Sequence, residues 1–239
     1  MNLGMISTLR PDLLGQTLAS FGEHALAKDG IGEVFVNLDR AFGDEDDLAA
    51  CQKLILDRFP QAVINVPDEP GFTRAVQWVW SSVPDGPFLY LEDDWICLRD
   101  IDLDEAASLL VDGTTMVPFL TREHGTKGRR DFSLQNDRPR LFGFPIGPAR
   151  RWAPAFATSP GIIDAEFART AASLMDPALD PEKQMRFGEN EPLMEFVTPF
   201  RCRFFKAPDG SPLIKDIGRD WHDARGSKKV TSGAKTHWE

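Results

Sequence analysis

The sequence predicts an α/β fold: a mostly parallel, doubly wound sheet in the first half, followed by an irregular α+β second half. Three observations predict it. Short β-rich runs alternate with helix-like stretches over the first ~100 residues. Proline, glycine and aspartate separate these segments, as in loops between strands and helices. After residue 120 the alternation stops and polar, proline-rich stretches take its place.

The expected elements follow in order along the chain. Predicted strands span residues 3–7, 33–38, 62–66, 88–91 and 115–120. Asp12 can cap a first helix whose apolar face carries Leu13, Leu14, Leu18 and Phe21. Helical periodicity predicts further helices over residues 46–59, 72–83, 104–111 and 162–175. Residues 121–140 are polar and basic and predict a long surface loop, and residues 187–196 predict a helix or turn.

Length and composition indicate one domain over residues 1–239, divided into halves of about 1–118 and 119–239. Three widely spaced cysteines argue against a disulfide framework and against a structural zinc site. No secretory or membrane-spanning segment is evident, so a cytoplasmic location is expected. The net charge of −10 disfavours a partner gripped through many nucleic-acid phosphates.

Three consecutive carboxylates, Glu92, Asp93 and Asp94, directly follow the apolar run Phe88–Leu91. At the carboxyl end of a central strand they would project into the crevice where open α/β sheets bind ligands. Hard oxygen ligands there suit Mg²⁺ or Mn²⁺ held jointly by protein and substrate phosphates. The alternative is a solvated acidic turn with no ligand.

Four features occur in a recognisable order. They are Ile6–Leu14 (ISTLRPDLL) with Thr17, Leu18 and Ser20; Val36–Asp39; Gly71-Phe72; and the apolar strand before Glu92-Asp93-Asp94. This order resembles family 2-type glycosyltransferases with the GT-A fold, over residues 3 to about 100. The resemblance implies a metal-dependent transfer of a sugar from a nucleotide-sugar, most often a UDP-sugar, to a hydroxyl. The second half would then hold the acceptor.

The resemblance also implies roles for single residues. Thr8 and Asp39 would contact the nucleobase and ribose, with Asp93 near the ribose and Arg10 in the same donor-binding turn. Glu92 and Asp94 would bind the divalent cation, with Glu92 in place of the family's leading aspartate. Arg74 would contact phosphate, although it lies about two positions earlier than the family's arginine.

The C-terminal region and aromatic residues supply further candidates. His222 resembles the family's third metal ligand, with His237 as its competitor, and Arg219 would neutralise the diphosphate. Trp95 would stack on a sugar or the acceptor, or else simply pack against the strand. A carboxylate base is also required for inverting transfer. Glu189 and Glu191 are the candidates, because Asn190 stands where the family carries its aspartate.

Two other functions remain open from the sequence. A nucleotidyltransferase would use a similar sheet, but residues 5–11 contain no glycine for a triphosphate loop. The second is a non-catalytic nucleotide- or glycan-binding protein, which Asn190 favours because it stands in place of the expected catalytic aspartate. The acceptor is expected to be a glycan or another small molecule, and a modified nucleic-acid base is a further alternative that the charge disfavours.

Overall fold

The computed structural model describes the chain except for residues 27–29, 123–130, 138–139, 142–143, 149–150, 228 and 239. Its central sheet has the order β12–β6–β11–β4–β1–β2–β3. The strands are β1 (Asn2–Ser7), β2 (Val34–Leu38), β3 (Val63–Asn65), β4 (Pro87–Glu92), β6 (Thr114–Pro118), β11 (Gly161–Asp164) and β12 (Arg201–Cys202). Only β11 among these seven runs antiparallel to its neighbours, so the mostly parallel sheet is confirmed.

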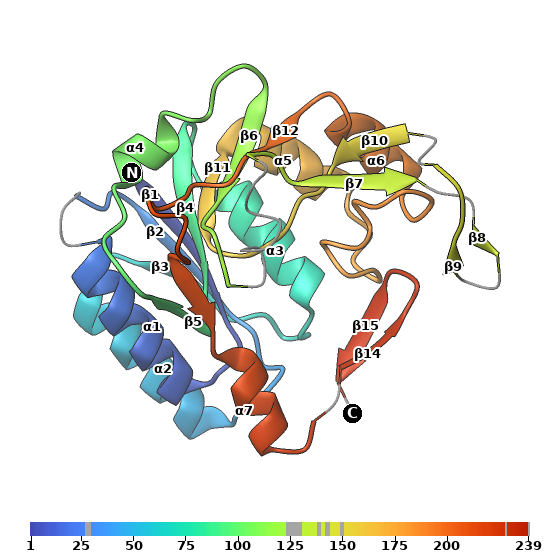
Figure 1. The fold of residues 1–239 in the computed structure, drawn as a ribbon. Coiled ribbons are helices and arrows are strands. Elements are labelled where there is room, and N and C mark those ends of the chain that lie inside the picture. The colour runs from blue at the N-terminus through green and yellow to red at the C-terminus, as the bar shows by residue number, and fades with distance from the viewer. Residues whose placement is uncertain are drawn as a thin grey trace.

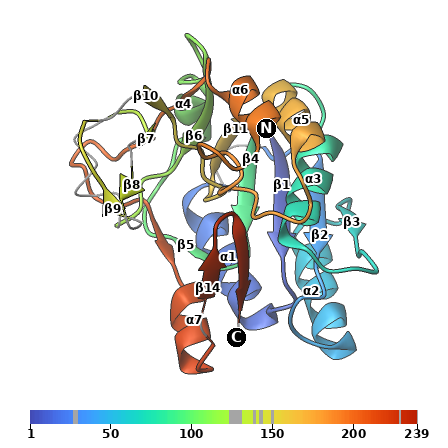
Figure 2. The same cartoon turned by 90° about the vertical axis from the view of Figure 1, so that its right-hand side faces the viewer.

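Helices cover both faces of the sheet (Figure 1). They are α1 (Pro11–His24), α2 (Glu45–Arg58), α3 (Phe72–Ser82), α4 (Leu103–Ala107), α5 (Ala165–Leu174), α6 (Glu191–Val197) and α7 (Gly218–Ala224). Helices α1 and α2 pack with one apolar cluster, and α3, α5 and α6 pack with the other (Figure 2). Helix α2 begins directly after Asp44, because Asp44 caps the helix and forms a capping box with Asp47.

The register of the central strands determines where the site lies. Ile6 of β1 pairs with Asn37 of β2 on one side and with Glu92 of β4 on the other. All three strands are parallel, so the residues that follow them emerge at one edge of the sheet. The chain order reverses at β1, whose neighbours β2 and β4 lead to opposite ends of the sheet.

Two sequence-based predictions for the second half are wrong in part. Ile162 and Ile163 form strand β11 between β4 and β6, and the helix begins only at Ala165. Gly161 permits this close pairing, because an added Cβ would lie 2.5 Å from both Pro118 Cα and Val117 O. The stretch 121–140 is not entirely loop, since Leu134–Asp137 forms β7; its residues 123–130 and 138–139 lie outside the described part.

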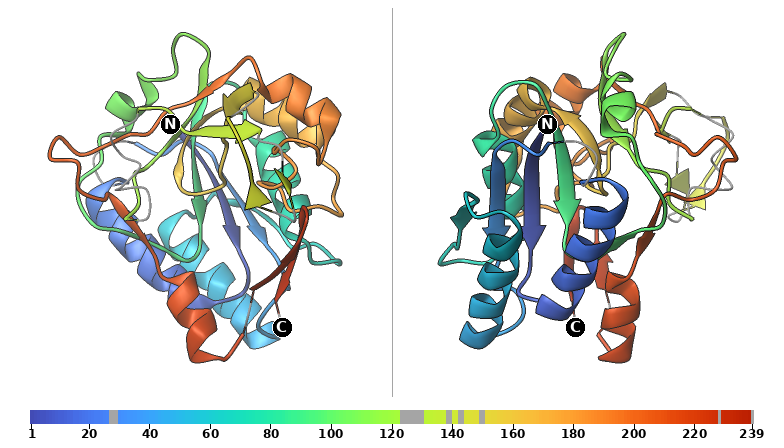
Figure 3. Two further views of the ribbon diagram at one scale, coloured as in Figure 1. Left: turned by 45° about the vertical axis from the view of Figure 1, so that its right-hand side comes forward. Right: turned by 90° about the vertical axis from the view of Figure 1, so that its left-hand side faces the viewer.

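Short two-stranded sheets complete the second half. They pair β5 (Trp95–Cys97) with β13 (Ile214–Asp216), β7 with β10 (Arg151–Pro154), β8 (Arg140–Leu141) with β9 (Phe144–Pro145), and β14 (Lys229–Ser232) with β15 (Lys235–Trp238). Helix α7 and the β14–β15 hairpin lie at the carboxyl ends of the parallel strands (Figure 3). Among the described helices, none is long and apolar enough to cross a membrane.

Candidate active site

A cavity of about 800 Å³ opens at the carboxyl ends of β1, β2 and β4, beneath α7 and the C-terminal hairpin. It gathers nine of the predicted site residues: Thr8, Arg10, Asp39, Glu92, Asp93, Asp94, Trp95, Arg219 and His222. It also gathers residues that the sequence did not single out: Phe42, Thr158, Ser159, Asp180, Glu182, Asp216, Gly218, Lys235 and Thr236.

Asp93 holds the floor of this cavity together. Its carboxylate is 1% exposed and accepts hydrogen bonds from Ser7 Oγ at 2.8 Å and from the backbone N–H of Thr8 at 2.9 Å. Arg10 adds a third contact, with one guanidinium nitrogen 2.5 Å from Asp93 Oδ1. These donors satisfy both oxygens, so Asp93 couples the end of β1 to the end of β4.

Arg10 serves two carboxylates at once. The same nitrogen lies 3.0 Å from Asp94 Oδ2, and the guanidinium is flanked by the rings of Phe42 and Trp221, at 5.8 and 5.3 Å. Burial lowers the pKa of Arg10, but the two carboxylates outweigh it and raise the pKa above its ordinary value. The preceding residue, Leu9, has a φ of 56°, a sparsely populated conformation that turns the chain at this point.

Burial disfavours the charged forms of Glu92 and Asp94. Burial raises the pKa of Asp94 to about 6, with Asp93 and Asp216 adding to the rise and Arg10 opposing it. Burial also raises the pKa of Glu92 well above its usual range, together with Asp94 and Glu182. Each of these carboxylates would therefore gain from a positive charge that binds among them.

Glycine is required beside Asp94. Gly218 begins α7, and a Cβ there would lie 2.7 Å from Asp94 Cγ and 3.0 Å from Asp94 Cβ. The backbone N–H of Ile217 donates to the carbonyl of Asp94 at 2.8 Å, which fixes this approach. Helix α7 thus packs directly on the acidic strand end. The ring of its His222 contacts Phe42 and Trp221, with centroids 5.3 and 5.1 Å away.

The donor set fits a divalent cation held jointly with a phosphate ligand. Within the described residues no group of three His, Cys, Asp or Glu side chains is placed to hold a metal. The set Glu92, Asp94 and His222 is therefore not a preassembled three-ligand site. Mg²⁺ and Mn²⁺ nucleotide sites commonly use one or two carboxylates plus phosphates. Glu92 and Asp94 meet that lower requirement through their oxygen chemistry and their raised pKa values.

The buried polar atoms without a hydrogen bond include two on the residues that follow β1 and β2. Thr8 Oγ1 and Asp39 Oδ1 are buried and have no such partner in the described part of the chain. Asp39 Oδ2 accepts the N–H of Gly71 at 2.8 Å, and burial raises the pKa of this carboxyl. Buried polar atoms are normally satisfied, so a ligand with matching donors and acceptors is the simplest partner for them.

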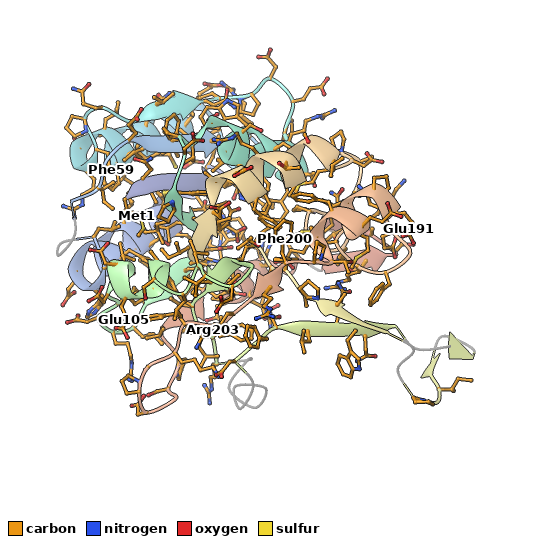
Figure 4. The ribbon with its side chains drawn as sticks, turned by 90° about the horizontal axis from the view of Figure 1, so that it is seen from above. Met1, Phe59, Glu105, Glu191, Phe200 and Arg203 are labelled. Atoms are coloured by element: carbon orange, nitrogen blue, oxygen red, sulfur yellow. The ribbon has the colours of Figure 1, made fainter. Side chains whose placement is uncertain are left out.

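Three predicted site residues lie outside the cavity lining. Arg74 is half exposed and pairs with Glu69 at 3.1 Å. Glu189 and Glu191 are exposed, and Figure 4 shows Glu191 at the outer edge of the molecule on α6. The structure does not bring these residues to the strand-end carboxylates, and their roles stay predictions. The side chain of His237 lies outside the described part.

A structural role of residue 190 explains why asparagine rather than aspartate stands there. Its side chain accepts the N–H of Leu193 and so caps α6, while its Nδ2 donates to Leu174 O at 2.9 Å and to Gln184 Oε1 at 3.0 Å. An aspartate could cap the helix but could not donate these two bonds.

Comparisons with known proteins place this geometry in a recognised fold. No family model matches the sequence, and neither does any curated protein. Solved structures do match. A Pyrobaculum calidifontis mannosyltransferase, PcManGT, in complex with GDP-Man and Mn²⁺, superposes with TM-score 0.59 at 12% identity. S. aureus TarS (residues 1–349) superposes with TM-score 0.53 at 11% identity.

A third structure shares the fold but has another activity. A CMP:2-keto-3-deoxy-manno-octonic acid synthetase complexed with CTP superposes with TM-score 0.50 at 14% identity, covering 95% of this chain and 98% of its own. The present chain is covered over 94% and 93% by PcManGT and TarS but spans only 59% and 62% of the lengths of those chains. The fold is therefore GT-A-like, as the sequence predicted, and it is shared by a mannosyltransferase and by a synthetase that was solved with CTP.

Proposed function

We propose that this protein is a metal-dependent glycosyltransferase that moves a sugar from a nucleoside diphosphate sugar to an acceptor hydroxyl with inversion. The supporting observation is the cavity itself, at the switch point of a GT-A-like sheet. Its lining combines buried polar atoms that have no partner in the described chain with carboxylates whose pKa values are raised. A UDP-sugar is the proposed donor, and the GDP-Man of one structural neighbour makes a GDP-sugar the first alternative.

The described residues divide the work of donor binding. Asp39 would accept hydrogen bonds from the nucleoside, and the Thr8 hydroxyl would donate one to it. The nucleoside would thereby supply the partners that Asp39 Oδ1 and Thr8 Oγ1 lack in the described chain. Glu92 and Asp94 would hold Mg²⁺ or Mn²⁺, which neutralises charge on the leaving diphosphate. Arg219 and Lys235 line the cavity mouth and would add positive charge near the phosphates.

A nucleotidyltransferase fits the first turn less well. Enzymes that bind a triphosphate need uncommitted backbone N–H groups or a free basic side chain in that turn. Here the N–H of Thr8 donates to Asp93, and Arg10 is shared between Asp93 and Asp94. The Thr8 N–H and the Arg10 Nη2 group are therefore already used within the protein.

Titration calorimetry with UDP, GDP, CDP and TDP, each with and without Mn²⁺, tests the proposal. One nucleotide should bind in the presence of Mn²⁺ and bind at least tenfold more weakly without it. Asp94→Ala should remove the dependence on Mn²⁺, whereas Asp57→Ala, an exposed carboxylate on α2, should leave it intact. Failure of every nucleotide to bind with Mn²⁺ present would refute the proposal.

A further inference from the structure

The part of the cavity lining that comes from the second half of the chain carries carboxylates that the donor does not require. It is built from the segment Thr158–Ser159 before β11 and the loop between α5 and α6, with the C-terminal hairpin beside it. The loop contributes Asp180 and Glu182. These residues are separated in sequence from the strand-end carboxylates and come from the second half of the chain.

Asp180 is committed to holding the loop and the hairpin. Its Oδ1 accepts the N–H groups of Glu182 and Lys183, and its Oδ2 accepts the hydroxyl of Thr236 at 2.8 Å. The Lys183 ammonium lies 3.5 Å from the same carboxylate. With both oxygens engaged by the protein, Asp180 is not free to accept a proton from a substrate.

Asp216 is committed to the start of α7. Its Oδ1 accepts the N–H of Arg219 at 3.1 Å, and its Oδ2 lies 3.7 Å from the Arg219 guanidinium. It also raises the pKa of Asp94 and so lies on the proposed metal side of the cavity.

Glu182 is fixed at one oxygen only. Its Oε1 accepts the backbone N–H of Thr158 at 2.8 Å and the Thr158 hydroxyl at 3.0 Å. Oε2 makes no hydrogen bond that the described residues show. The side chain is half-buried, lines the cavity, and lies close enough to Glu92 to raise the pKa of that residue. It is thus a positioned carboxylate with one free oxygen beside the proposed metal site.

The neighbouring hydroxyl points to the same use. Ser159 Oγ is buried at the cavity wall and has no hydrogen-bond partner within the described chain. A polyhydroxylated acceptor seated here would satisfy Ser159 while presenting one hydroxyl to Glu182. The wall formed by Thr158, Ser159 and Glu182 therefore has the groups that an acceptor subsite needs.

We propose that Glu182 is the catalytic base of the transfer and that Thr158 positions it. The inference rests on the proposed glycosyltransferase function. As the acceptor oxygen bonds to the anomeric carbon, its proton passes to a Glu182 carboxylate oxygen. The bond from that carbon to the diphosphate oxygen breaks with its electron pair, and the nucleoside diphosphate leaves. Glu189 and Glu191 then have no role in proton transfer.

The test compares Glu182→Gln with the matched variants Glu189→Gln and Glu191→Gln. Two quantities are measured on each: Mn²⁺-dependent binding of UDP and GDP by calorimetry, and release of UDP from UDP-glucose or GDP from GDP-mannose, with water and with glycerol as acceptors. Glu182→Gln should bind UDP or GDP with an affinity within twofold of wild type. Its rate of UDP or GDP release from the nucleotide-sugar should fall at least 100-fold, the usual range for loss of a general base. Glu189→Gln and Glu191→Gln should stay within threefold in both.

A second variant guards against misfolding. Thr158→Val keeps the backbone N–H contact but removes the hydroxyl, so release should fall several-fold with binding unchanged. Retention of more than a tenth of wild-type release by Glu182→Gln would overturn the inference, as would loss of its nucleotide binding or slow release by Glu189→Gln or Glu191→Gln. Wild-type protein that binds nucleotide but releases none would also overturn it. No binding by the wild type would instead overturn the proposed function, and this inference with it.

Discussion

Replacement of Gly218 by alanine tests whether α7 really packs on the acidic strand end. Alanine restricts the unfolded chain more than glycine does, so without a steric conflict this change should stabilise the protein by about 0.4–1 kcal/mol. The structure predicts the opposite sign. The new Cβ would lie 2.7 Å from Asp94 Cγ, well inside ordinary contact distance, and Asp94 is held in place by Arg10.

The expected magnitude follows from the two ways to relieve the overlap. Either α7 moves away from β4, or the Asp94 carboxylate turns and lengthens its 3.0 Å contact with Arg10. Overpacking of this kind costs about 1–3 kcal/mol. For a chain of this length, that corresponds to a fall in melting temperature of roughly 2–12 °C. Because Asp94 is a proposed metal ligand, Mn²⁺-dependent nucleotide binding should weaken as well.

Gly15→Ala is the matched control. Gly15 lies within α1, and a Cβ there would find its nearest neighbour, Leu54 Cδ1, at 4.0 Å. This variant should gain about 0.5–1 kcal/mol from helix propensity alone. Thermal unfolding of both variants, followed by circular dichroism, gives the comparison. If Gly218→Ala melts at or above the wild-type temperature with unchanged nucleotide binding, the packing of α7 on Asp94 is refuted.

Three further changes test the network around the site. Arg10→Ala should lower the free energy of unfolding in urea by about 3–5 kcal/mol, because it leaves buried Asp93 without its cation. Arg74→Ala, at an exposed ion pair, should change it by less than about 1 kcal/mol. Similar losses for the two variants would contradict the role of Arg10 as the buried partner of Asp93. The pKa of Asp94 rises from 3.8 to about 6 on folding, so the metal-free protein should lose stability as pH rises through that window. Asp94→Asn should therefore melt higher than wild type at pH 7.5 but not at pH 4. A difference in melting temperature that does not depend on pH would contradict this. Asn190→Ala should lower the free energy of unfolding by about 2 kcal/mol, because the helix cap and two donated hydrogen bonds are lost. Turnover per folded molecule should stay unchanged. A drop in turnover in fully folded protein would instead place Asn190 in the active site.

The N-terminal half could be predicted because its signals are local. Each parallel strand is a short apolar run that ends at a polar residue, and parallel strands place those ends at one edge. Thr8, Asp39 and the acidic triplet were therefore expected to meet, and all of them line the cavity. The sequence could not show that Asp93 faces inward to Ser7 and Arg10 while Asp94 remains partly exposed.

The second half could not be predicted to the same depth because its contacts are distant in sequence. Ile162 and Ile163 are apolar and adjacent, and such a pair fits the start of a helix as well as a strand buried on both faces. Glu182 lies in a proline-rich loop without periodicity, and its anchor, Thr158, is far away in the chain. The Gly188-Glu189-Asn190 stretch resembled a catalytic motif, but Asn190 is used to cap α6 and tie its loop.

The charge balance around β4 links the stability of the fold to the proposed chemistry. Four carboxylates follow one another around the cavity floor through mutual electrostatic contact, from Glu182 to Glu92, Asp94 and Asp216. The buried cation Arg10 contacts only Asp94 among these four, and it is shared with Asp93. The fold therefore satisfies Asp93 in full and leaves Glu92 and Asp94 with raised pKa values. A cation that arrives with a diphosphate would relieve that repulsion only when substrate is bound, which couples donor binding to the stability of this part of the sheet.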